Sequence, residues 1–206
     1  MKLMTEKIKL RELVEEAAQV ISPLLNQKKS ITFTTDVSPF VPKSIKNDKV
    51  KIKQILVNLL SNAVKFTNEG SISLHVDVDT RDGISRSLTA PNTLTKDRAI
   101  GTKFVRFSVA DTGVGINTQD FESIFSAFEQ ASLKKNGQVL GGTGLGLNIC
   151  LLLIELMKGA ISVKRYVSTN YVTCTFDTHV VTDQREEASL LFGFHTTTSL
   201  LYQLLH

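Results

Sequence analysis

The stretch Lys51-Ile-Lys-Gln-Ile-Leu-Val-Asn-Leu-Leu-Ser-Asn-Ala-Val-Lys-Phe66 carries the strongest structural signal in the chain. On a helix at 100° per residue, five of its polar side chains fall within an arc of roughly 80°, and nearly all the other positions are apolar. These five residues are Lys51, Gln54, Asn58, Asn62 and Lys65. The pattern predicts a helix that is buried on most sides and presents a narrow polar stripe.

Two asparagines stand at the centre of this stripe, where a solvated helix face more often carries a mixture of Lys and Glu. An Asn carbonyl oxygen is a hard, neutral ligand suited to a Mg²⁺ ion that phosphate already binds. Lys65, one turn further on, can contact a phosphate oxygen as a point charge. Taken alone, the stripe also fits a surface helix that bears two polar residues, since Asn is common on helix surfaces.

The segments on both sides of this helix predict a mixed α and β domain. Residues 71–79 show the clearest strand pattern, because Ile72, Leu74, Val76 and Val78 alternate with polar residues. Asp48 is expected to begin the central helix, which runs to about Thr67. The other predicted elements are strands at 7–10, 30–37, 103–110, 161–165 and 171–178, helices at 11–25, 120–128 and 145–157, and a long insertion at 80–102.

The composition is that of a soluble globular chain of one domain, or of one domain plus appendages: 206 residues, 42% hydrophobic and 21% charged. The formal net charge of +4 is too diffuse to indicate nucleic-acid binding. The longest apolar run, 149–157, is interrupted by Glu155 and is too short to cross a membrane. With only Cys150 and Cys174 and no signal peptide, we expect a cytoplasmic protein without structural zinc or disulfides.

A second motif, Asp111-Thr-Gly113-Val-Gly115-Ile116, directly follows a predicted strand. Its two glycines would let the backbone approach a planar ligand, and the carboxylate can accept a hydrogen bond from an exocyclic amine such as that of adenine. A tight turn that closes a strand uses the same residue types, so this reading also stays open.

A third motif, Gly141-Gly142-Thr143-Gly144-Leu145-Gly146-Leu147, opens an apolar helix. The free N–H groups and the positive dipole end of a helix start form a docking place for an anion. The motif is not a Walker A loop, because no Gly-Lys-Ser/Thr follows. It also fails the dinucleotide fingerprint, because Leu147 stands where the third glycine belongs. A flexible start of a helix is the alternative reading.

In this chain order the three motifs resemble the nucleotide-binding domain of histidine kinases, gyrase, Hsp90 and MutL. Asn58-Leu-Leu-Ser-Asn62-Ala-Val-Lys65 is similar to the N box of sensor histidine kinases, 111–116 and 142–147 to their two glycine boxes, and Phe125-Ser-Ala-Phe128 to the F box. The residues of these motifs are most similar to those of hybrid histidine kinases of the eukaryotic kind. The resemblance implies an α/β two-layer sandwich, the Bergerat ATP-binding fold, with helices on one face of a mixed sheet over residues 1–180.

The resemblance also implies a role for each motif. Asn58 would coordinate Mg²⁺, and Asn62 and Lys65 would face the phosphates of ATP. Asp111 would bind the adenine amine, and the loop 129–141 would form a lid whose start Phe125 and Phe128 anchor in the core. The remaining positions that would contact ATP are Gly113, Gly115, Ile116, Gly142, Thr143, Gly144, Leu145, Gly146 and Leu147.

Gln54 separates two branches of this superfamily. The ATPase relatives place a glutamate one turn before the metal asparagine to activate water, and an amide cannot act as that base. We therefore expect phosphoryl transfer to a histidine, with Gln54, Asn58 and Lys65 at the reacting end of the site. The implied partners are a dimerisation domain in another chain that carries this histidine, and a receiver-domain response regulator downstream. Nucleic acid and membrane are not expected partners.

The chain departs from the family pattern at several places. None of its four histidines, His75, His179, His195 and His206, has the setting of the family's phosphoacceptor. Gln138 stands where hybrid kinases commonly have an arginine in the lid, and residues 168–170 replace the glycines expected at the turn of the last hairpin. An impaired ATP-binding regulator and a dominant-negative fragment therefore stay as alternatives. A gyrase-type ATPase is a third alternative, which Gln54 counts against. The tail 181–206 has no assigned role.

Overall fold

The computed structural model describes residues 2–79, 104–117, 120–121, 123–126, 134–135, 138–139, 144–166, 169–177 and 179–180. The predicted insertion at 80–102, the tail at 181–206 and most of the predicted lid at 129–141 lie outside these residues. No helix in the described part of the chain is both long enough and apolar enough to span a membrane.

Five strands form the main sheet in the order β2-β4-β5-β9-β8. The first pair, β2 with β4, is parallel, and the other three pairs are antiparallel, so the sheet is mixed as predicted. The strands are β2 (Ile31–Val37), β4 (Gly70–Asp79), β5 (Phe104–Asp111), β8 (Ala160–Tyr166) and β9 (Thr169–Asp177). The alternation seen in the sequence of β4 is real, because Ile72, Leu74 and Val76 are fully buried.

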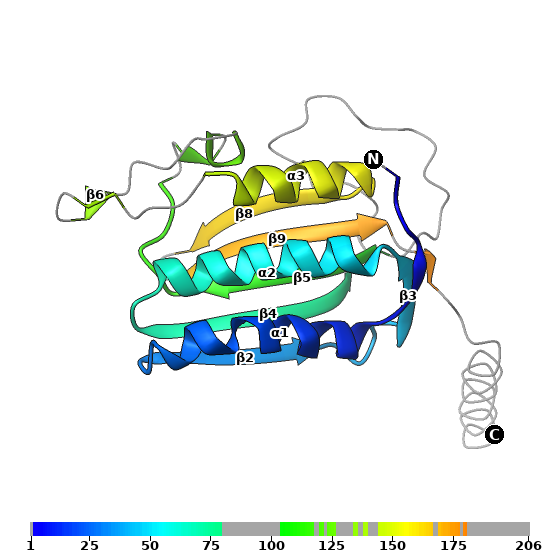
Figure 1. The fold of residues 1–206 in the computed structure, drawn as a ribbon, viewed down its shortest axis with the longest axis horizontal. Coiled ribbons are helices and arrows are strands. Elements are labelled where there is room, and N and C mark those ends of the chain that lie inside the picture. The colour runs from blue at the N-terminus through cyan, green and yellow to red at the C-terminus, as the bar shows by residue number, and fades with distance from the viewer. Residues whose placement is uncertain are drawn as a thin grey trace, which may run out of the picture.

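Three helices cover one face of this sheet, which confirms the predicted two-layer sandwich (Figure 1). They are α1 (Leu10–Asn26), α2 (Lys49–Phe66) and α3 (Gly146–Leu156). Helix α2 lies in the middle, with α1 on one side and α3 on the other (Figure 1). This central position explains why α2 has apolar residues around most of its circumference.

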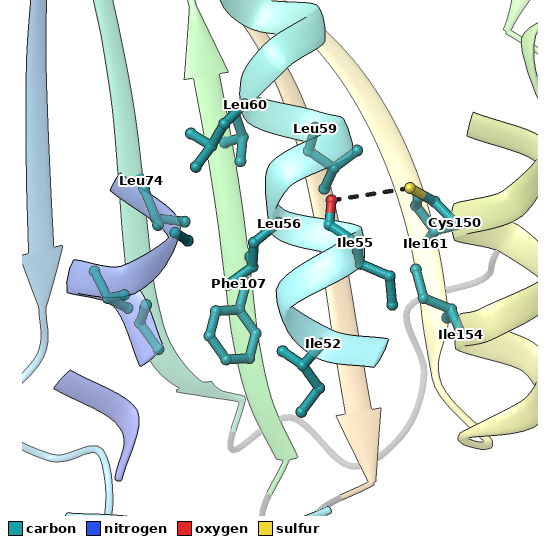
Figure 2. Packing of buried hydrophobic residues seen from close by; sticks show 14 of the residues in the cluster. Ile52, Ile55, Leu56, Leu59, Leu60, Leu74, Phe107, Cys150, Ile154 and Ile161 are labelled. Atoms are coloured by element: carbon teal, nitrogen blue, oxygen red, sulfur yellow. Dashed lines mark hydrogen bonds between the residues drawn. The ribbon is translucent and has the colours of Figure 1, made fainter. Parts of the chain in front are cut away.

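The core lies between α2 and the sheet. Figure 2 shows apolar side chains of α2 directed toward β4, β5 and α3, where Leu74, Phe107 and Ile154 are buried. Each fully buried side chain of this size stabilises the fold by about 1.5–3 kcal/mol relative to its exposed state. The residues of α2 in this layer are Ile52, Ile55, Leu56, Leu59, Leu60, Ala63 and Val64.

An ion-pair cluster joins α1 to α2 at their surface. The Glu16 carboxylate accepts hydrogen bonds from Lys49 at 2.7 Å and from Lys53 at 3.0 Å. These two lysines, Lys49 first, hold the pKa of Glu16 below its ordinary value of 4.5. The ionised Glu16 carboxylate therefore stabilises the folded state.

Several short elements were not predicted. Strand β3 (Ser44–Asn47) pairs with β1 (Glu6–Lys9) and β10 (His179–Val180) in a second, small sheet. Two further strands of two residues each, β6 (Lys134–Lys135) and β7 (Gln138–Val139), pair within the loop predicted to be irregular. The short helical piece predicted around 120–128 is of the 3₁₀ type in the described residues, at Asp120 and at Ser123–Phe125.

The turn of the last hairpin is shorter than predicted. Strand β8 ends at Tyr166 and β9 begins at Thr169, and these two residues are partners in the register. Asn170 therefore belongs to β9 rather than to the turn, where it pairs with Arg165 on one side and with Asp111 on the other. The sequence suggested a turn because Ser, Thr and Asn are common turn residues.

Candidate functional site

The polar stripe of α2 is held in place at both ends of the helix. At the start, the buried carboxylate of Asp48 caps the helix by accepting a hydrogen bond from the Lys51 N–H at 3.1 Å and another from the Met4 N–H at 2.9 Å. At the other end, the Lys28 ammonium donates to carbonyl oxygens of the last turn. Both contacts complement the helix dipole, so α2 is a fixed support for the side chains of its stripe.

Two asparagines of the stripe face the start of α3. The Asn58 Nδ2 donates a long hydrogen bond of 3.4 Å to the Gly146 carbonyl. The Asn62 Nδ2 would lie only 3.8 Å from a Cβ atom added at Gly146, so the two helices approach closely here. The first and third sequence motifs therefore meet, as the resemblance implied.

Within the stripe, Gln54 precedes the two asparagines and Lys65 follows them. The Lys65 Nζ lies 4.8 Å from the centroid of the Phe66 ring and close to the C-terminal end of α2. Gln54, one turn before Asn58, is exposed. Within the described residues, no hydrogen bond or ion pair joins Gln54 to the start of α3, in contrast to Asn58.

Asp111 and the turn after it lie against the C-terminal end of α2. The Val114 N–H donates to the Phe66 carbonyl at 3.2 Å. A Cβ atom at Gly113 would collide with this same carbonyl, so only glycine allows the close approach. The second motif is thus joined to the first by backbone contact.

The Asp111 carboxylate is oriented by two donors. Its Oδ1 accepts hydrogen bonds from the Gly113 N–H and from the Asn170 Nδ2, both at 2.9 Å. Asn170 is buried, with 5% of its surface exposed. Among the described residues, no side-chain or turn donor contacts the Asp111 Oδ2, so this oxygen keeps its capacity to accept a hydrogen bond from a ligand.

The rest of the turn rests on the hairpin of β8 and β9. Gly115 has a φ of +80°, and a Cβ atom there would come within 2.9 Å of both the Arg165 guanidinium carbon and the Asn170 Oδ1. The Arg165 side chain donates to the Ile116 carbonyl at 3.3 Å. Ile116 itself is partly buried against the core.

The described part of the third motif begins at Gly144. This glycine has a φ of +68°, and Leu145 precedes α3 without a side-chain cap. The first N–H groups of α3 are therefore without the capping partner that a Ser or Asp would provide. Leu147 packs against the core, whereas Gly142 and Thr143 lie outside the described residues.

The side chains at the start of α3 are fixed from two directions. The Asn148 Nδ2 donates to the Phe125 carbonyl at 2.9 Å, and Phe125 is buried as predicted. Phe128 lies outside the described residues. Burial raises the pKa of the Cys150 thiol to about 12, while a hydrogen bond to Asn58 acts in the opposite direction.

The described residues contain no cluster of three or more His, Cys, Asp or Glu side chains that could bind a metal ion by itself. A divalent cation at Asn58 would therefore need ligands from another source, such as phosphate oxygens. The contact of the Asn58 Nδ2 with Gly146 suits this arrangement, because it directs the nitrogen to a carbonyl and leaves the amide oxygen as the ligand atom.

Three residues near these motifs were not singled out from the sequence as part of a site: Asn170, Arg165 and Lys28. Asn170 and Arg165 follow Asp111 by more than fifty positions, and only the register of three strands brings them to the turn. Lys28 reaches across from the end of α1. No local pattern marks any of these contacts, although the lack of glycine at 168–170 is a visible departure from the family.

Comparison with known proteins agrees with this geometry. The family described as "Histidine kinase-, DNA gyrase B-, and HSP90-like ATPase" matches residues 47–183. "Histidine kinase 5" of Arabidopsis thaliana is 35% identical over 173 residues, which cover 82% of this chain and 18% of that protein. "Hybrid signal transduction histidine kinase K" of Dictyostelium discoideum is 35% identical over 155 residues, or 75% of this chain and 12% of that protein.

Solved structures show the same fold. Full-length ShkA, crystallised in complex with AMPPNP, has a TM-score of 0.68 and 28% identity, and the match covers 88% of this chain and 32% of that one. The catalytic domain of the histidine kinase ThkA has a TM-score of 0.62 at 23% identity and covers 84% of this chain and 97% of that one. The chain spans less than a fifth of the length of the two curated relatives above. By its sequence and fold, the chain belongs to the family of histidine kinase-, DNA gyrase B- and HSP90-like ATPases.

Proposed function

We propose that the chain is the catalytic, Mg²⁺-ATP-binding domain of a hybrid-type sensor histidine kinase. In this proposal it transfers the γ-phosphoryl group to a histidine on a dimerisation domain of another chain, and a receiver-domain protein acts downstream. The observation that carries the proposal is the meeting of three motifs. Asn58 and Asn62 face the start of α3, and the turn after Asp111 contacts the end of α2.

Each motif has a distinct task in this proposal. The Asp111 Oδ2 accepts a hydrogen bond from the adenine amine, and the turn through Gly113, Gly115 and Ile116 lies beside the base. The N–H groups at the start of α3 and the Lys65 ammonium attract the phosphates. Glycines at 142, 144 and 146, with Thr143, Leu145 and Leu147 between them, would bring the backbone near the triphosphate.

Mg²⁺ fits the residues at Asn58, whose amide oxygen is the available ligand atom. When bound, the ion neutralises charge on the phosphate oxygens during transfer. The accepting imidazole nitrogen forms the new bond to the γ-phosphorus, the bond to the bridging oxygen breaks, and ADP leaves. The domain contributes alignment and charge compensation, because Gln54 cannot serve as a base that activates water.

The accepting histidine is not found within the described part of the chain. His75 lies on the exposed face of β4, where its Nδ1 is 2.8 Å from the Asp36 carboxylate. This pair places His75 at the surface of the sheet. A second candidate function, an ATP-binding regulator without transfer, is favoured by the same lack of an acceptor setting among the four histidines.

Radiolabelled [γ-³²P]ATP tests the proposal when the chain is incubated alone and with a separately supplied dimerisation domain. Acid-labile, alkali-stable label on the supplied domain is expected for the kinase. Free phosphate would indicate an ATPase instead, and binding without turnover would indicate the regulator. Calorimetry without measurable ATP binding would contradict every version of the proposal.

Two variants test the residue assignments. Asp111→Asn should weaken ATP binding, with Asp36→Asn as the matched control on the exposed face of the sheet. Asn58→Ala should weaken the dependence of ATP affinity on Mg²⁺, with Asn26→Ala at the end of α1 as its control. An unchanged ATP affinity in Asp111→Asn would remove the adenine assignment.

A further inference from the structure

The hairpin of β8 and β9 supplies a buried amide to the candidate base-binding group. The Asn170 Nδ2 donates to the Asp111 Oδ1 at 2.9 Å, and the two residues are direct partners in the register of β5 and β9. Only 5% of Asn170 is exposed. The contact with the carboxylate depends on the Asn170 side chain, because a glycine at this position could not make it.

The orientation of the Asn170 amide follows from its two neighbours. An amide oxygen facing the Asp111 carboxylate would be repelled, so the nitrogen faces the carboxylate and the oxygen lies toward the turn. On that side, a Cβ atom at Gly115 would come within 2.9 Å of the Asn170 Oδ1. The side chain therefore fills the space between the carboxylate and the glycine turn.

Asn170 also determines which carboxylate oxygen stays available. The Asp111 Oδ1 already accepts hydrogen bonds from the Gly113 N–H and from Asn170. Both donors contact the same oxygen, so they restrict rotation of the carboxylate about its last bond and leave Oδ2 for a ligand. Arg165, the partner of Asn170 on β8, donates to the Ile116 carbonyl and supports the other end of the turn.

We infer that Asn170 is a positioning residue for base recognition: its amide fixes the Asp111 carboxylate in the orientation that accepts the 6-amino group of a purine nucleotide. The inference rests on the proposed function, because it presupposes that Asp111 binds the base. It adds to that function a residue that contacts no ligand and acts through Asp111. Its effect should therefore depend on whether the ligand carries a 6-amino group.

Two nucleotides that differ only at this group separate positioning from a general structural role. ATP has the 6-amino group, and purine riboside triphosphate lacks it. With Asn170→Ala, the Kd for ATP should rise about tenfold, because one hydrogen bond that orients a charged acceptor is lost. The Kd for purine riboside triphosphate should change less than about twofold in the same variant, since Asp111 has no donor to accept from that ligand.

Two further variants complete the experiment. Asn170→Asp has nearly the same shape but places a second carboxylate against Asp111, and it should raise the Kd for ATP at least as much as Asn170→Ala. Thr169→Ala, one position earlier in β9, is the matched control, because neighbouring side chains of a strand point to opposite faces. Thermal unfolding of each variant establishes that it is folded before its Kd is used.

The outcomes distinguish the inference from the proposed function. Equal losses of affinity for the two nucleotides, or an unchanged Kd for ATP in both Asn170 variants, would overturn the inference while ATP binding stands. A parent chain that binds both nucleotides equally well would also overturn it, because Asp111 would then not recognise the amine. A parent chain that binds neither nucleotide would remove the proposed function together with the inference.

Discussion

The Lys28 side chain binds the C-terminal end of the central helix α2. Its ammonium donates to the carbonyl oxygens of Val64 at 2.6 Å, Lys65 at 3.2 Å and Thr67 at 2.7 Å. A charged hydrogen bond contributes about 1.5–3 kcal/mol, and a cation at a partly buried helix C-terminus contributes up to about 2 kcal/mol. These contributions overlap, so we expect Lys28→Met to lower the free energy of unfolding by about 2–3 kcal/mol.

Urea unfolding followed by circular dichroism measures this loss. Lys29→Met is the matched control. This neighbouring lysine is exposed, and its replacement removes the same formal charge as Lys28→Met. For a domain of this size, about 2 kcal/mol corresponds to a fall in Tm of about 4–8 °C. The same urea midpoint for both lysine variants would refute the reasoning, since the effect would then come from net charge and not from the three carbonyls.

Three other predictions follow from the described contacts. Glu16→Gln should lower Tm near neutral pH, and the difference from the parent should vanish as the pH falls below the depressed pKa of Glu16, because only the ionised group stabilises the fold; a difference that grows toward acid pH would contradict this. In a Cys174→Ser background, Cys150 should react with a disulfide reagent only when the chain unfolds, since its thiol is buried and its pKa is about 12; rapid labelling of the native chain would show otherwise. Thr67→Val should raise the urea midpoint by an amount equivalent to about 1 kcal/mol, because the Thr67 hydroxyl is buried without a hydrogen-bond partner among the described residues; a lower midpoint would mean that the hydroxyl has one.

The parts of the fold with a regular pattern could be predicted from the sequence. Helix α2 was evident because a central helix needs apolar residues on most sides, and β4 because one face of the sheet is buried. Strand β3 was not evident, because Ser44 and Ile45 are adjacent and both buried, which breaks a simple alternation. Its pairing with β1 and β10 joins segments from both ends of the domain, and no local pattern reports such a contact.

The residues of the candidate site were likewise only partly predictable from the sequence. Asn58, Asn62 and Asp111 lie in motifs whose residue types indicate a ligand, and the structure brings these motifs together. Asn170 was interpreted as a turn residue because Asn is common in turns. The strand register instead places it beside Asp111. Residues that act through another residue leave little trace in sequence, because their partners are distant along the chain.

The register of β4 and β5 also separates the candidate site from the connection between these strands. Asp111 pairs with Ile72 at one end of the two strands, and Phe104 pairs with Asp79 at the other. The seven steps from Phe104 to Asp111, at about 3.3 Å each, put roughly 23 Å between the two ends. A fluorescent protein or an affinity tag inserted between these strands would therefore be anchored far from Asp111, which makes this connection a practical place for a reporter.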